Sequence, residues 1–206
     1  DESRENLVSG FILKWVRDGI ITIREKESGA IVKKKNYDMY LDVDAKFENK
    51  QETALYKMFI HASKDGVLQT KAFQKWCSKH YKKIDDWFTK VDNVTEDSMN
   101  KNGYAKTKTI YKRFLFWNIP RDRTVWRDKA YDQCLYVWGF NNFLEDEDNM
   151  KEKAAIEVKL WDEYLIFAAV LGIADRVEKQ LKVAIPRYEE TSTRSEEHTS
   201  ELQSRQ

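Results

Sequence analysis

The feature that most constrains the fold of this chain is an apolar run near its C-terminal end. From Tyr164 to Ala174, eleven residues pass without a charge, and charges return at Asp175. A helix needs about 20 apolar residues to cross a bilayer, whereas runs of about 10 to 14 usually form a buried core helix. We therefore expect this run to be the central helix of a folded domain and not to span a membrane.

The side chains of this run are arranged for packing on several neighbours. Gly172 is expected to allow the close approach of a neighbouring helix, or a bend. Apolar residues recur at spacings of three and four, which predicts one buried helical face. That face comprises Trp161, Tyr164, Leu165, Ala168 and Leu171, and Ile166, Ala169, Val170 and Ile173 widen it almost all round.

Composition indicates packed helices. The chain has 206 residues, of which 41% are hydrophobic, enough for one domain or two small ones. Seven Trp, ten Tyr and ten Phe against seven Gly and two Pro are more typical of helices than of a turn-rich β protein. A net charge of +1 gives no bulk reason to favour nucleic acid or an acidic substrate. Two cysteines, Cys77 and Cys134, make no disulfide framework and favour a reducing compartment. We find no signal peptide.

The N-terminal half alternates helical and strand-like patterns. Apolar spacing predicts a helix over residues 4–18, ended by Gly19, and a hairpin over residues 20–35. A second helix is expected at residues 52–63 and is stopped by Gly66. A strongly periodic helical segment follows, which Thr70 can cap and which can break near residues 79–84. The stretch "NGYAKTKTIYKRFLFW" then returns to a turn and strand-like alternation.

These patterns predict an α+β fold that is mainly helical. Two winged-helix-like units, at residues 1–48 and 49–118, are followed by a helical region at residues 119–190 and a disordered tail at residues 191–206. Pro120 is expected to mark the boundary before a helix over residues 124–143. The acidic stretch "EDEDN" reads as a linker or helix start, and the chain is then helical to about Val183.

A metal site is the first chemical hypothesis to weigh. His61, Cys77, His80 and Cys134 form a Cys2His2 set by number, and Cys77 and His80 are three residues apart. Both lie on the same apolar stripe as Phe73 and Trp76, however, where a thiol and a ring simply pack. We therefore expect no metal and no other cofactor.

An enzyme is not supported by the sequence. Cys77 with His80 meets the need of a cysteine nucleophile for an activating base only nominally, and burial would raise the thiol pKa. The sequence contains no Gly-rich phosphate loop, GxSxG elbow or HExxH motif. Acidic pairs such as Asp85-Asp86 are expected on solvated faces. We predict no catalytic residue.

Two lysine clusters are candidate contacts to an anionic surface. One is formed by Lys33, Lys34 and Lys35 in the first hairpin, and the other by Lys82 and Lys83 beside Lys79. Phosphates of nucleic acid would suit both clusters, and so would anionic lipid headgroups. The helix before the first hairpin offers only Lys14 and Arg17 among apolar residues, whereas a groove-reading helix needs polar side chains. Nucleic acid is therefore the less favoured partner.

The C-terminal third carries a family resemblance. "GF" at Gly139-Phe140, "FL" at Phe143-Leu144 and "LWDEYLIFAAVLGIA" from Leu160 to Ala174 resemble motifs of a bacterial family of predicted membrane proteins, domain of unknown function 2207. "GFILKWVRDGIITI" and "LYKMFIHASKDGVLQTKAFQKWC" look like its upstream winged-helix-like parts. The resemblance covers nearly all of residues 1 to 193. It implies a cytosolic region whose parent protein has membrane-spanning segments and an outer-facing β domain, and it supplies no catalytic residue.

The functional expectation combines these points. We expect a cytosolic, non-enzymatic scaffold or interaction module on the cytoplasmic face of the membrane, which binds a protein partner or the parent's own membrane-spanning segments. A membrane-tethered winged-helix nucleic-acid binder is the alternative. Residues 194–204, "RSEEHTSELQS", resemble the translation of a sequencing-adapter oligonucleotide, so we expect this tail to lie outside the natural fold.

Overall fold

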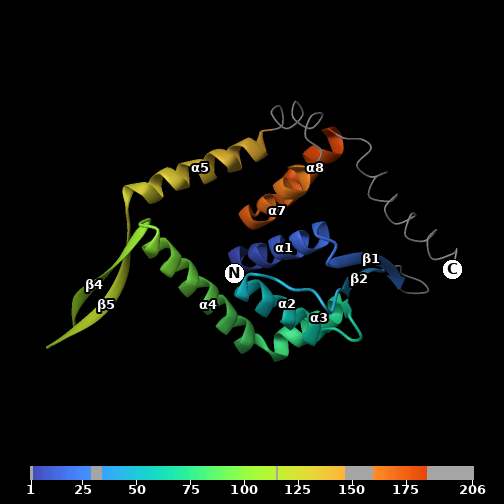
Figure 1. Cartoon of the computed structure of the whole chain (residues 1–206), viewed down its shortest axis with the longest axis horizontal. Helices are drawn as coiled ribbons and strands as arrows, with labels where there is room; N and C mark the ends of the chain where they lie inside the picture. The colour runs from blue at the N-terminus through green and yellow to red at the C-terminus, as the bar shows by residue number, and fades with distance from the viewer. Residues whose placement is uncertain (1, 29–33, 115, 147–159, 185–206) are drawn as a thin grey trace. The chain divides into compact units, whose positions relative to one another are not determined.

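The computed structural model describes residues 2–28, 34–114, 116–146 and 160–184 (Figure 1). The chain divides into two compact units, one formed by residues 1–17 together with 138–206 and the other by residues 18–137. The described ranges contain mainly helices, with two small antiparallel sheets. The predicted mainly helical α+β class is therefore confirmed. The predicted four-part division of the chain stays a prediction.

The first unit is helical. It comprises α1 (Glu2–Arg17), the C-terminal end of α5 (Asp128–Glu145), α7 (Trp161–Leu171) and α8 (Ala174–Ala184). In Figure 1, α1 and α7 lie side by side, and the two helices are in contact. The buried core is formed by Leu144, Trp161, Ala168 and Val177. The apolar run from Tyr164 thus forms a core helix, as its length predicts.

Gly172 ends α7 in the left-handed conformation. Its φ is 79°, its N–H donates to the Ala169 carbonyl at 3.1 Å, and the Ile173 N–H donates to the Ala168 carbonyl at 2.8 Å. This geometry favours glycine because a Cβ would be strained there. A Cβ at Gly172 would also lie 2.8 Å from Asn6 Nδ2 of α1. The glycine therefore provides both the turn and the close approach that the sequence predicts.

The second unit is built on a three-stranded sheet. Strands β1 (Ile21–Ser28), β2 (Lys34–Leu41) and β3 (Val67–Gln69) are antiparallel in that order. The predicted first hairpin is confirmed, with Ile21 opposite Leu41 and Ser28 opposite Lys34, and its turn lies outside the described residues. This unit also contains three helices: α2 (Lys50–Ala62), α3 (Thr70–Lys79) and α4 (Tyr81–Lys101). The predicted break near residues 79–84 is the junction of α3 and α4.

A second hairpin follows α4. Strands β4 (Ala105–Phe114) and β5 (Trp117–Trp126) pair only with each other among the described strands. In a winged-helix unit the short strand after the first helix would join this hairpin, but β3 pairs with β2 instead. The winged-helix arrangement is therefore not confirmed.

Two local predictions were wrong. Pro120 does not end an element but lies inside β5 opposite Tyr111, and the next helix begins at Asp128. A proline is tolerated here because each strand of a two-stranded ribbon has a free edge. Thr70 does not cap α3, since its hydroxyl donates to the Tyr37 carbonyl at 3.1 Å. Thr70 thus makes a hydrogen bond to the distant strand β2 instead of a capping bond within its own helix.

None of the helices within the described ranges has the length and apolar content to cross a membrane. The adapter-like segment and the predicted "EDEDN" linker fall outside the described residues, apart from Glu145 and Asp146.

The close packing of α1 on α7 is tested at Gly10. A Cβ at this buried glycine would lie 2.5 Å from Val170 Cγ2 and 3.6 Å from the Ile166 carbonyl oxygen. Overpacking a core costs about 1–3 kcal/mol, against a gain of about 1 kcal/mol from replacing a helical glycine by alanine. Gly10→Ala should therefore lower the free energy of unfolding, measured in urea, by about 1 kcal/mol.

Gly139 supplies the matched control. It lies within α5, and a Cβ there would meet nothing within 4 Å. Gly139→Ala should raise the free energy of unfolding by up to about 1 kcal/mol. When Val170 is also replaced by alanine, the clash with its Cγ2 is removed, and Gly10→Ala should then raise the free energy of unfolding as well. Equal stabilisation by both alanines in the native background would contradict the close contact.

Tyr56 joins α2 to the ends of the sheet in the second unit. Its side chain is 3% exposed, and its hydroxyl donates to the Asp42 carbonyl at 2.9 Å and the Ile20 carbonyl at 3.3 Å. Burial, together with the negative charge of Asp42, raises the pKa of Tyr56 to about 12. The folded state therefore favours the protonated phenol more strongly than the unfolded state does.

Tyr56→Phe should lower the free energy of unfolding by about 1 kcal/mol near neutral pH, because it removes the hydrogen-bond donor. Since the folded pKa of Tyr56 is raised from 10.0 to about 12, the phenol's contribution is fully present below pH 10 and is lost as pH rises through 12. The stability gap between native chain and variant should therefore narrow over that range. A gap that stays constant in urea titrations at these pH values would refute the assignment.

Candidate functional site

The predicted lysine clusters fall in two parts of the second unit. Lys33 lies outside the described residues, while Lys34 and Lys35 lie in β2, opposite Ser28 and Glu27. Lys82 and Lys83 lie exposed in the first turn of α4. A role of these lysines at an anionic surface stays a prediction.

The basic surface around Lys82 and Lys83 is larger than the sequence analysis proposed. Lys71, Lys75 and Lys79 are exposed on α3 at spacings of four, so they share one face of the helix. These lysines line a shallow surface depression together with Gln74 and Ser78. No acidic residue occurs between Thr70 and Ile84. The sequence signal that could have identified this surface is the four-residue spacing of the three lysines, which places them on one face of a helix.

An aromatic pair adjoins this basic surface. The Trp76 and His80 rings are stacked, with centroids 4.4 Å apart, and His80 Nδ1 lies 2.9 Å from the Trp76 carbonyl oxygen. Lys83 Nζ lies 5.9 Å from the Trp76 ring centroid, at the outer limit of a cation–π contact. His80 therefore acts in packing the junction of α3 and α4.

The two cysteines differ in their surroundings. Burial raises the pKa of the Cys77 thiol, as the sequence analysis expected, which disfavours the nucleophilic thiolate. Cys134 is exposed on α5, and His61 is exposed on α2. Within the part of the chain that the structure describes, no three His, Cys, Asp or Glu side chains gather as metal ligands would.

The N-terminal part of α5 exposes large apolar side chains. Tyr131 is 66% exposed, Tyr136 73% and Val137 54%. Leu135 and Trp138 are exposed as well, and Ala130 is the one buried residue between Asp128 and Gly139. The apolar pattern predicted the helix but not this exposure, because a pattern alone does not show whether a side chain is covered by another element.

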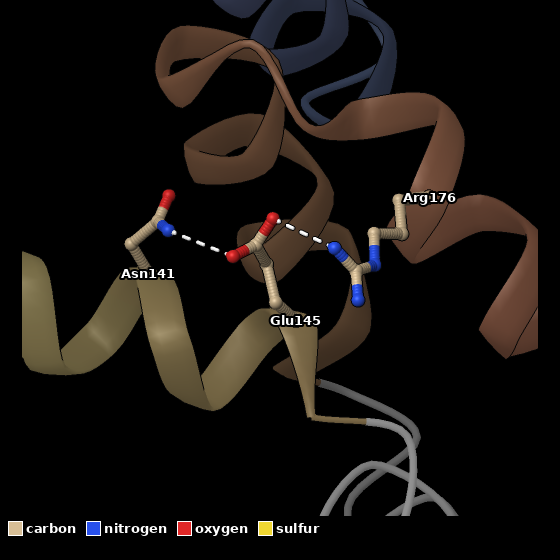
Figure 2. Close-up of polar contacts among 3 residues, drawn as sticks. All are labelled: Asn141, Glu145 and Arg176. Carbon is tan, nitrogen blue, oxygen red and sulfur yellow. Dashed lines mark hydrogen bonds and ion pairs between the residues drawn. The ribbon is translucent and has the colours of Figure 1, made fainter.

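The C-terminal end of α5 is fixed within the first unit. Figure 2 shows Glu145 of α5 between Asn141 and Arg176. Its carboxylate accepts from Asn141 Nδ2 at 3.3 Å and from Arg176 Nη1 of α8 at 3.0 Å. A partly exposed ion pair of this kind contributes about 0–1 kcal/mol. This trio connects α5 to α8.

The family comparison covers part of the chain. Residues 114–181 match the family model described as "Predicted membrane protein (DUF2207) C-terminal domain". Searches of curated proteins and of solved structures each returned no match. The match does not reach residues 1–113, so the resemblance of the upstream segments stays a prediction. The matched segment holds β5, α5, α7 and most of α8, and it is similar to the C-terminal domain of the predicted membrane protein family DUF2207.

Proposed function

We propose that this chain is a non-enzymatic interaction module on the cytoplasmic side of a membrane protein, and that α5 binds a protein partner. The observation that carries the proposal is the exposed apolar surface of α5. It consists of Tyr131, Leu135, Tyr136 and Val137, named the α5 face here, and it lies within the family-matched segment. Tyr131 and Leu135 are one turn apart on the same side of the helix, and Tyr136 and Val137 extend the exposed apolar surface around it. Trp138 continues the exposed apolar sequence along the helix.

The composition of the α5 face suits a protein partner. Tyrosine is enriched at protein interfaces because it offers a large rigid apolar surface and a hydroxyl that can hydrogen-bond. Exposed apolar side chains that cluster along one element commonly mark an interaction site. Two of the four residues of the α5 face are tyrosines, and none is charged. A membrane-spanning segment of the parent protein is the main competing occupant.

A binding role is better supported than catalysis. Burial keeps the pKa of the Cys77 thiol high, so this cysteine is a poor nucleophile. The ion pair of Glu145 and Arg176 connects two helices. The family description carries no activity.

The cytoplasmic side is favoured by cysteine chemistry. Cys77 and Cys134 are free thiols in the structure, and Cys134 is exposed on α5. Exposed thiols persist in reducing compartments and oxidise readily outside them.

The α5 face can be tested by photo-crosslinking. A photo-crosslinking phenylalanine analogue replaces Tyr136 in the chain expressed in bacterial cells, and the adduct is identified by mass spectrometry. We expect one discrete protein adduct. With that protein purified, Leu135→Asp should weaken binding at least about tenfold, since central apolar anchors carry most of an interface's binding energy.

Val94 provides the matched control for this test. It is an exposed apolar residue of α4, 51% accessible, in the same unit of the chain. Val94→Asp should leave the affinity unchanged, and both variants should keep the native circular dichroism spectrum. An adduct equally strong from position 94, or equal loss of affinity in both variants, would refute a binding role for the α5 face. A crosslink into a membrane-spanning segment would assign the face to that segment instead.

A nucleic-acid binder is the second candidate, carried by the basic surface of α3. Lys71, Lys75 and Lys79 present three cations on one helical face, and Lys82 and Lys83 follow without an intervening acid. Evenly spaced cations on a helix suit a phosphate backbone.

Lys71→Gln/Lys75→Gln/Lys79→Gln tests this candidate. If α3 contacts phosphates, duplex DNA affinity should fall and the slope of log affinity against log salt should become shallower by roughly 3, about 0.9 per phosphate contact. A fluorescence anisotropy titration measures both. Unchanged affinity, or no DNA binding by the native chain at low salt, would remove this candidate.

A further inference from the structure

The hairpin of β4 and β5, residues 105–126, is an exposed ribbon, named the arm here. Every arm residue from Lys106 onward whose side chain is described is exposed, except Thr124, which is half-buried. Figure 1 shows the arm as a long two-stranded ribbon that follows α4. An isolated two-stranded hairpin is marginally stable in water, and three strands or a packing surface are usually needed. The arm therefore has the form of an element that packs on something outside the described chain.

The strand register divides the arm into two unlike faces. Residues directly opposite each other in an antiparallel pair share a face, and the face alternates along each strand. The register from Ala105 opposite Trp126 to Phe114 opposite Trp117 therefore assigns each described side chain. One face, the cationic face, carries five basic and four apolar residues: Lys106, Lys108, Ile110, Lys112, Trp117, Ile119, Arg121, Arg123 and Val125. It contains no acidic residue.

The opposite face is the one that attaches the arm to α4. Thr107 and Thr124 share this face, and both hydroxyls donate to Glu96 Oε1 of α4, at 3.3 and 2.9 Å. Farther out on the same face, the Thr109 hydroxyl donates to Asp122 Oδ1 at 2.7 Å. The only acid of the arm thus lies on this face. Among the arm side chains that the structure describes, those of the cationic face have no polar partner on α4.

Like charges face each other on the cationic face. Lys108 lies directly opposite Arg123 in the register. Such a pair is destabilising in a sheet unless an anion lies between or beside the two cations. Neither residue forms an ion pair with any residue that the structure describes. Cations placed only to guard strand edges against aggregation would not need to be concentrated on one face.

The tip of the arm carries apolar side chains that are exposed to solvent. Phe116 is 93% exposed and Trp117 is 76% exposed. Lys112 lies behind this tip on one strand and Arg121 on the other. Aromatic side chains with basic residues behind them match the interface of an anionic bilayer, where the rings lie at headgroup depth and the cations meet the phosphates. A regular nucleic-acid duplex would meet the cations, but its bases are stacked on each other and would leave the apolar tip in water.

We propose that the arm binds the surface of an anionic phospholipid bilayer, with Phe116 and Trp117 inserted at headgroup depth and the cationic face on the lipid phosphates. The net charge of the whole chain is only +1, so it does not reveal the local concentration of positive charge on the arm. The arm itself carries six basic residues (Lys106, Lys108, Lys112, Arg113, Arg121 and Arg123) against Asp122, which is 6 − 1 = +5. The proposal uses a surface separate from the α5 face and does not depend on it.

Vesicle co-sedimentation of the full chain tests the proposal. Vesicles of phosphatidylcholine alone are compared with vesicles that also contain phosphatidylglycerol. We expect binding to the second kind, weakened by salt. A basic residue near such a surface strengthens binding about fivefold, so Lys108→Gln/Lys112→Gln/Arg123→Gln should weaken it about a hundredfold. Phe116→Ser/Trp117→Ser should also weaken binding, including at high salt, where the tip contributes most.

The control removes the same number of charges elsewhere. Lys46→Gln/Lys57→Gln/Lys90→Gln, which lies outside both the arm and α3, should retain most of the vesicle binding, and all variants should keep the native thermal midpoint because the altered residues are exposed. Equal losses in this control and in the arm variant would show a nonspecific charge effect and overturn the proposal. So would the absence of binding to anionic vesicles, an unaltered affinity of the tip variant, or an arm variant that loses duplex DNA binding but no vesicle binding.

Discussion

The packing of α1 on α7 is the contact on which the first unit depends. These helices come from opposite ends of the sequence, and Gly10 and Gly172 remove the side chains that would hold them apart. Since contact energies between helices come from close interdigitation, small residues at the crossing make the interface tight. Their association closes the chain around residues 18–137, so the second unit is an insertion between two halves of the first. Loop-closure entropy rises only slowly with length, and such a long insertion is tolerated.

The ion pair of Arg17 and Glu163, 3.6 Å apart, lies on the same pair of helices. It is partly exposed, so its energy is small beside that of the buried groups. Trp161, Ala168 and Val177, each at most 1% exposed, supply the larger apolar contribution. The unit is therefore held mainly by apolar packing.

The second unit separates its charges in space. The chain as a whole is nearly neutral, yet the arm has a face with five cations and no acid, and α3 has a row of lysines without a carboxylate. Attraction to an anionic surface depends on local charge within about one Debye length, roughly 8–10 Å, and not on the net charge of the molecule. A nearly neutral chain can thus present two basic surfaces. The exposed aromatic tip distinguishes the arm from α3, whose lysines surround polar Gln74 and Ser78.

The sequence by itself determined the local elements. Apolar spacing predicted α1, α2 and the break between α3 and α4, β-branched alternation predicted the first hairpin, and the length of the Tyr164–Ala174 run predicted a core helix. These are decided by interactions within a few residues. Tertiary structure alone decided that β3 joins β2, that α1 packs on α7, that Thr70 bonds to Tyr37, and that the α5 face and the arm remain exposed. Periodicity identifies which face of an element is apolar or basic, but whether another element covers that face depends on long-range packing that no local pattern encodes.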